Sequence, residues 1–173
     1  MKRKMLMWLL AILCVVALIV LSLFLFLSPF RHLGGDTDYR EARKAIVSQF
    51  EKNRDAFNKA AEQVIRQEDA ADVSVRKVDT VYLTERNGHT VVTFLMGSQG
   101  LMTGGQNWGL YYSPEDVPVN LWEDTLVSAH EAHCYYWQSE DERHFYATEK
   151  IADGWYVYYE DYDGNRHGLS WNE

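Results

Sequence analysis

The segment VSVRKVDTVYLTERNGHTVVTFLMG, residues 73–97, decides the fold because apolar and polar residues alternate on both sides of one Asn-Gly pair. A repeat of two is typical of a β-strand with one buried face. Asn87 and Gly88 tolerate the positive φ angles that a two-residue type I′ turn requires. We therefore predict a β-hairpin whose apolar face contains the cross-strand pairs Leu83 with Val92 and Val81 with Phe94, together with Met96.

A helical pattern precedes this hairpin. Asp38 and Glu41 have the spacing of a capping box, which marks the start of a helix. Apolar residues then recur at helical spacings, at Ile46, Phe50, Phe57, Ala61 and Val64. We predict one long helix, over about residues 38–68, whose apolar stripe covers the sheet. The alternative is a coiled coil, which would make the protein a homodimer.

The rest of the chain predicts more strands. Aromatic and β-branched residues flank Asp153 and Gly154, which indicates a second hairpin. The glycine-rich residues 97–109 favour a flexible connection or a bulged strand, and residues 117–134 favour strand over helix. We predict an α+β fold for residues 36–173, with the long helix packed on an antiparallel meander sheet of about five or six strands across residues 73–163.

The N-terminal region predicts a membrane anchor. Met5 to Leu27 is an uncharged run of 23 residues, which as a helix of roughly 34 Å would cross a bilayer. No small-residue cleavage pattern follows it, which favours an anchor over a signal peptide. Lys2, Arg3 and Lys4 precede the run and place the N-terminus in the cytoplasm. Residues 1–35 are therefore predicted to be a cytoplasmic stub, a transmembrane helix and a glycine joint, with the domain outside the cell.

Charge and cysteine content limit the classes of function. The net charge of −8 is concentrated in the C-terminal third, and no Lys or Arg occurs between Arg86 and Arg143. This region lacks the cations that neutralise phosphates, so we expect no nucleic-acid partner.

Cys14 lies in the predicted span and Cys134 in the domain, so we expect no disulfide between them. We expect Cys134 to be buried, with an intermolecular disulfide as the alternative.

Catalytic and metal-binding motifs are not evident. His130 and His133 are the candidate metal ligands, but their spacing of three does not match the helical zinc motif, which needs a spacing of four. The glycine-rich segment lacks the ending of a phosphate loop. We predict no metal, no cofactor and no catalytic residue. The sequence does not decide whether the protein is an enzyme, although it favours a non-enzyme.

Aromatic residues are dense in the C-terminal half, and they give the predicted binding surface. In a strand beginning at Trp155, alternate tyrosines face away from the helix-covered side. The candidate surface residues are Tyr156, Tyr158, Tyr162, Trp108 and Tyr112. Tyr and Trp suit protein interfaces, so we predict an envelope protein with a non-enzymatic domain for protein–protein contacts. The alternatives are a glycan or small-molecule binding module on this aromatic face and, third, a hydrolase.

Three short segments carry a resemblance. These are WGLYYSP at 108–114, YATEKI at 146–151 and WYVYYE at 155–160. They resemble uncharacterised small single-pass membrane proteins of Gram-positive gut bacteria, over roughly the last 70 residues. The resemblance implies a bacterial cell-envelope location and gives no catalytic residues. The predicted architecture of a helix against a sheet also resembles the cystatin-like and nuclear-transport-factor-like folds, which by itself does not indicate a function.

Overall fold

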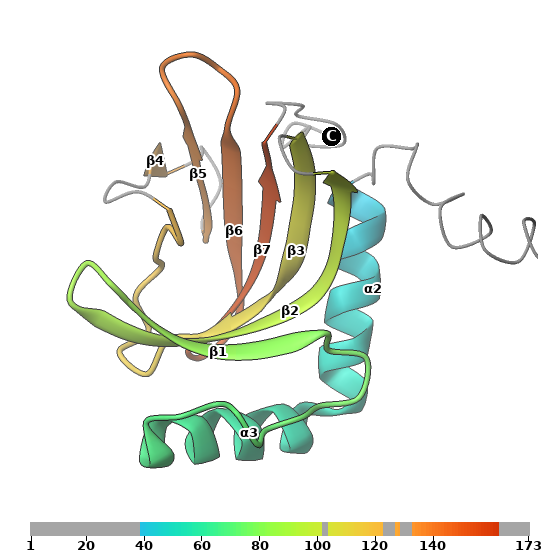
Figure 1. Cartoon of the computed structure of the whole chain (residues 1–173), viewed down its shortest axis with the longest axis vertical. Helices are drawn as coiled ribbons and strands as arrows, with labels where there is room; N and C mark the ends of the chain where they lie inside the picture. Colours follow the sequence, from blue (N-terminus) through green and yellow to red (C-terminus); the bar gives the residue numbers. More distant parts are fainter. Residues whose placement is uncertain (1–38, 102–103, 123–126, 129–132, 163–173) are drawn as a thin grey trace, which may run out of the picture. The chain divides into compact units, whose positions relative to one another are not determined.

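The computed structural model describes residues 39–101, 104–122, 127–128 and 133–162 (Figure 1). Two helices come first, α2 (Tyr39–Lys52) and α3 (Arg54–Gln67). The strands follow as β1 (Thr80–Arg86), β2 (His89–Leu101), β3 (Gly104–Tyr112), β4 (Val127–Ser128), β5 (Cys134–Gln138), β6 (Phe145–Ala152) and β7 (Trp155–Asp161).

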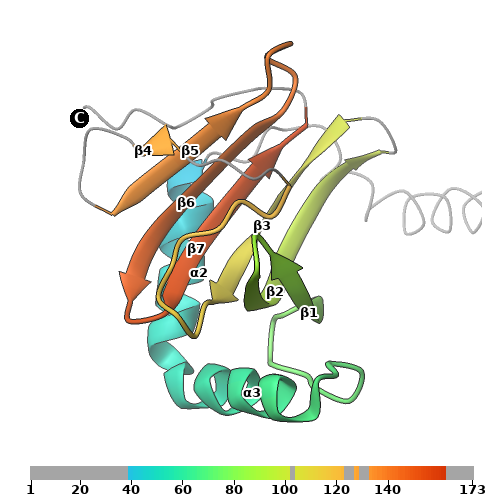
Figure 2. The same cartoon turned by 90° about the vertical axis from the view of Figure 1, so that its left-hand side faces the viewer.

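The predicted single long helix is wrong, because the chain forms two helices that meet at Asn53. α2 runs along the sheet, and α3 turns across that direction below β1 and β2 (Figures 1 and 2). Asn53 has φ −131° and ψ 24°, which is not helical. Its side-chain amide donates to the carbonyl oxygen of Gln49 at 2.9 Å. Asparagine competes with the helix in this way for backbone groups, so it is a natural point of interruption.

The apolar stripe of the two helices is buried, as predicted. Its members are at most 3% exposed, and they are Ile46, Phe50, Phe57, Ala61 and Val64. They pack with Val92, Phe94 and Leu110 of the sheet in one core cluster. The chain's own sheet therefore covers the stripe, and the stripe is not available for the coiled coil that was the alternative.

The sheet is not the predicted meander of five or six strands. Within the described residues, seven strands pair in the order β1-β2-β3-β7-β6-β5-β4, with every neighbouring pair antiparallel. After β3 the chain crosses to the far edge and returns to the middle of the sheet with β7. The fold class is therefore corrected to a seven-stranded antiparallel sheet with two short helices on one face.

Both predicted hairpins are present, and the first has the predicted register. Leu83 pairs with Val92 and Val81 with Phe94. Asn87 and Gly88 have φ angles of 53° and 77°, as a type I′ turn requires. The second hairpin joins β6 to β7 through the turn that contains Gly154.

The described part of the glycine-rich segment 97–109 forms the end of β2 and most of β3, so the bulged-strand prediction is the correct one of the two alternatives. The register of β2 against β3 shifts between Leu95 and Gly97, and β2 bends strongly (Figure 1). A Cβ on Gly109 would lie 2.1 Å from the carbonyl oxygen of Phe94. Glycine at this position therefore allows two backbones to approach closely.

The described residues contain no helix that is long and apolar enough to cross a membrane. The predicted class of single-pass transmembrane protein therefore has no support in the described part of the chain. The predicted span, Met5 to Leu27, lies outside these residues. The predicted location of the domain outside the cell stays a prediction.

Candidate functional site

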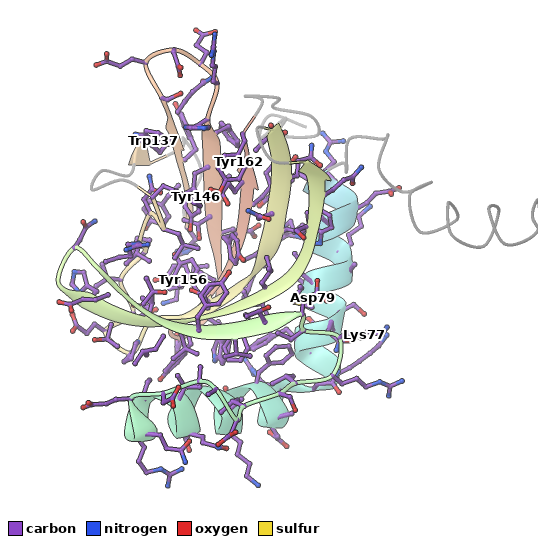
Figure 3. The ribbon with its side chains drawn as sticks, viewed as in Figure 1. Lys77, Asp79, Trp137, Tyr146, Tyr156 and Tyr162 are labelled. Carbon is purple, nitrogen blue, oxygen red and sulfur yellow. The ribbon has the colours of Figure 1, made fainter. Side chains whose placement is uncertain are left out.

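The tyrosines at the centre of the predicted aromatic surface are buried. Tyr156 is 1% exposed and Tyr158 is 2% exposed. Both lie on the concave face of the sheet, opposite the helices, and Tyr156 is seen there with Tyr146 in Figure 3. Residues 113–122, which we call the crossing segment, contribute Val119 and Leu121 to the same apolar cluster. The aromatic face is therefore a second core.

Hydroxyl groups of the concave face hold the crossing segment in place. The Val119 amide donates to the hydroxyl of Tyr111, and the Val119 carbonyl accepts from the hydroxyl of Tyr146, each at 3.1 Å. The hydroxyl of Tyr156 donates to the carbonyl oxygen of Asp116 at 2.9 Å. Burial raises the pKa of all three tyrosines, so they remain neutral hydrogen-bonding groups.

A short chain of hydrogen bonds continues from Tyr111 into the sheet. Thr148 Oγ1 lies 3.0 Å from the hydroxyl of Tyr111 and 2.9 Å from the carbonyl oxygen of Val157. A threonine hydroxyl has one hydrogen, and a carbonyl can only accept. Thr148 therefore donates to Val157 and accepts from Tyr111, which satisfies the buried hydroxyl groups of both side chains.

Glu160 is the acidic residue of interest on the concave face. It is 5% exposed, and its carboxylate accepts from the side-chain amide of Asn107 at 2.9 Å and from the hydroxyl of Tyr162. Burial raises its pKa to about 7, against the two hydrogen bonds that lower it. Asn107 and Tyr162 satisfy this carboxylate within the chain, so the arrangement explains how a buried acid is tolerated.

The other predicted surface residues are not brought together. Trp108 and Tyr112 lie on the helix-covered face and pack against the first core cluster. Tyr162 follows the end of β7, next to Glu160, and is half-buried. The five candidates Tyr156, Tyr158, Tyr162, Trp108 and Tyr112 therefore do not share one exposed surface.

The described residues include only one of the two candidate metal ligands. His130 lies outside the described residues, and His133 is exposed with a φ angle of 82°. No group of three potential metal ligands lies together in the described residues. Ser113 is buried, and its hydroxyl accepts from the Val117 amide at 3.2 Å, so it stabilises a turn. Cys134 is buried, as predicted.

The exposed edge of the sheet offers a different candidate. β1 has β2 as its one neighbour among the described strands. Its first five residues, Thr80 to Thr84, are uncharged and favour strands, and Tyr82 is 37% exposed. Edge strands of stable proteins are usually protected by proline, by inward-facing charge or by a covering segment. β1 has no proline, and its charged residues are at the hairpin end.

An acidic groove of about 550 Å³ runs beside this edge. One side is Asp79 with the first residues of β1, up to Leu83, and the other is the loop after α3, which includes Ala70 and Val73. The charged residues that line the groove are all acidic, namely Glu68, Asp69 and Asp79. Figure 3 shows Asp79 at the start of β1, with Lys77 further along the connection toward α3. The groove thus combines free strand backbone, apolar contacts and negative charge.

Three local features fix the shape of the groove. Glu68 ends α3 in the left-handed conformation, with φ 53°, which turns the chain away from the helix axis. The Asp69 carboxylate then accepts from the Ala71 amide at 2.9 Å. At the other end, the Asp79 amide donates to the Leu95 carbonyl at 2.7 Å and starts the pairing with β2. These features fix both ends of the connection that lines the groove, while the outer backbone edge of β1 has no partner among the described strands.

Sequence reasoning missed the groove because its two sides are separate in the chain. The residues Glu68 and Asp69 are visible as an acidic helix end, but nothing in the sequence places them beside β1. The chain itself matches no protein-family model, no curated protein and no solved structure. The groove and the edge strand are therefore interpreted from their own chemistry.

Proposed function

We propose that this domain is a binding domain that contacts another protein, and that an extended segment of the partner adds to the sheet along β1. The observation that supports this most is an edge strand whose outer side pairs with none of the described strands, with a groove directly beside it. Strand addition supplies backbone hydrogen bonds, and a neighbouring groove supplies selectivity for side chains. The function remains protein–protein contact without catalysis, but it is assigned to the sheet edge in place of the aromatic face.

Charge complementarity indicates the chemistry of the partner segment. With three carboxylates and no lysine or arginine in its lining, the groove favours a segment that carries Lys or Arg. In a strand, alternate side chains point to the same side. We therefore expect two basic residues separated by one residue, with β-branched or aromatic residues beside them.

A selection from random peptides tests the proposal. The full chain is used to select displayed peptides of about ten residues, a length that matches an edge strand. The expected outcome is a set of peptides enriched in Lys or Arg and in strand-forming residues, whose affinity falls as ionic strength rises. Selection of no peptide, or of peptides that bind equally well at high salt, would contradict it.

Substitutions in the groove provide the matched comparison. Glu68→Gln together with Asp79→Asn should weaken binding of the selected peptides by about two- to thirtyfold, since each exposed charge contributes about 0.2–1 kcal/mol. Asp72→Asn removes an exposed carboxylate from the same connection but outside the groove, and should leave the affinity unchanged. Equal effects of Asp72→Asn and of the pair would overturn the assignment to the groove.

A further inference from the structure

A second groove, of about 340 Å³, lies where α3 meets the turn between β6 and β7. It is lined by Arg54, Asn58, Glu62, Tyr112, Asp153 and Trp155. It shares no residue with the groove beside β1. Its volume is at the lower end of the range of about 300–1,000 Å³ that small-molecule sites occupy.

The helix side of this groove is polar. Arg54, Asn58 and Glu62 are spaced by four residues, so they follow one another along one face of α3. The Asn58 side-chain oxygen accepts from the indole nitrogen of Trp155 at 2.9 Å, which orients the Asn58 amide group. The Arg54 guanidinium lies over the Phe50 ring at 5.3 Å, which holds it at the end of the groove.

The sheet side supplies an aromatic surface. The Tyr112 ring lies against the Gly154 backbone, since a Cβ on Gly154 would be 2.7 Å from that ring. It also packs on the Trp155 ring, with the ring centroids 5.1 Å apart. Tyr112 is half-buried, so part of its ring faces the groove, and the Asp153 carboxylate lies at the exposed turn beside it.

These groups favour one class of ligand. Arg54 and Glu62 in the lining carry opposite charges, and the Asp153 carboxylate is paired with Lys150 at 3.6 Å, so the groove favours a neutral ligand over phosphate, sulfate or nucleotides. Carboxylate, carboxamide and guanidinium groups are planar and can each bond two neighbouring hydroxyl groups. A flat aromatic ring between such groups suits a ring that is apolar on its face and polar at its edge.

We infer that this groove binds a short neutral saccharide, with one pyranose ring on Tyr112 and its hydroxyl groups bonded to Asn58, Glu62 and Asp153. The inference is independent of the proposed protein contact at β1. It also differs from the predicted glycan site on the concave aromatic face, because the crossing segment covers that face.

Nuclear magnetic resonance tests the inference on the full chain, with maltose, lactose, mannobiose and N,N′-diacetylchitobiose as the probes. The signal to follow is the indole N–H of Trp155, which donates to Asn58 inside the groove. At least one disaccharide should shift this signal with saturation, and the indole signal of Trp137, on the opposite face of the sheet, should stay unchanged. No shift with any of the four probes would overturn the inference.

Substitutions of groove residues test whether the saccharide binds in this groove. Glu62→Ala and Asp153→Asn each change an exposed side chain and should weaken saccharide binding at least threefold. Glu51→Gln removes an exposed carboxylate from α2 outside the groove and should have no effect. Unchanged binding in both groove variants would overturn the inference. Peptide binding at β1 should be normal in all three variants, which separates the two proposals.

Discussion

The hydroxyl of Tyr146 on β6 donates a hydrogen bond to the carbonyl oxygen of Val119 at 3.1 Å. Val119 lies in the crossing segment, which has no strand partner of its own. Tyr111 bonds to the amide of the same residue at 3.1 Å. Buried backbone groups must be paired, so these two tyrosines replace the hydrogen bonds that a sheet would give to Val119.

Removing the Tyr146 hydroxyl should therefore destabilise the domain. We expect Tyr146→Phe to lower the free energy of unfolding by about 1–3 kcal/mol, because the Val119 carbonyl is left buried without its partner. Urea denaturation measures the change. The control is Tyr136→Phe, on β5, whose side chain is only partly buried. A loss in Tyr146→Phe no larger than in the control would contradict this role for the hydroxyl.

Stability should depend on pH through Glu160. Its pKa is raised to about 7, so the folded state binds the proton more tightly than the unfolded state. The contribution of protonated Glu160 to the free energy of unfolding is therefore fully present below about pH 4.5, and it is lost as the pH rises to about 7. This rise in the pKa of Glu160 corresponds to a change of roughly 3 kcal/mol in the free energy of unfolding between low and high pH.

The Glu160→Gln variant isolates that dependence. Its amide is neutral at every pH, so the variant should be more stable than the wild type at pH 8 and should lose the difference near pH 5. Unfolding free energies at several pH values provide the measurement. Glu140→Gln, at an exposed position, should follow the wild-type curve. Parallel curves for the wild type and Glu160→Gln would rule out the buried carboxylate as the source.

Two glycines should respond differently to alanine. Gly88 has φ 77° and open space around it, so Gly88→Ala should cost about 1 kcal/mol of conformational strain. In Gly109→Ala the new Cβ would lie 2.1 Å from the Phe94 carbonyl oxygen, so β2 and β3 must separate. We expect this variant to lose more than 2 kcal/mol. Similar melting temperatures for the two variants would show that the close approach is not required.

Local patterns in the sequence predicted local structure well. The Asn87-Gly88 pair set the register of the first hairpin, because a two-residue turn leaves no freedom in strand pairing. The helical stripe from Ile46 to Val64 correctly predicted which side of the helices is buried. The break at Asn53 was missed because Phe57 follows Phe50 by seven positions, about two helical turns. The apolar residues on both sides of the break therefore look like one continuous helical stripe in the sequence.

The order of the strands in the sheet, and the segment that covers its concave face, could not be predicted from the sequence. The position of β7 beside β3 depends on a crossing segment without periodicity, so the strand order could not be inferred. The same segment buries Tyr156 and Tyr158, although their alternation in the sequence was interpreted correctly as one face of a strand. Surface and core faces therefore look alike until the covering segment is known.

The most direct test of the proposed function measures hydrogen exchange of the β1 amides in the full chain, with and without a saturating selected peptide. Alternate β1 amides point away from β2 and should exchange quickly in the free protein. Strand addition predicts that these amides slow by at least tenfold when the peptide is bound, while the amides on the β2 side change little. Unchanged exchange along Thr80 to Arg86, or slowing at another surface only, would contradict the account.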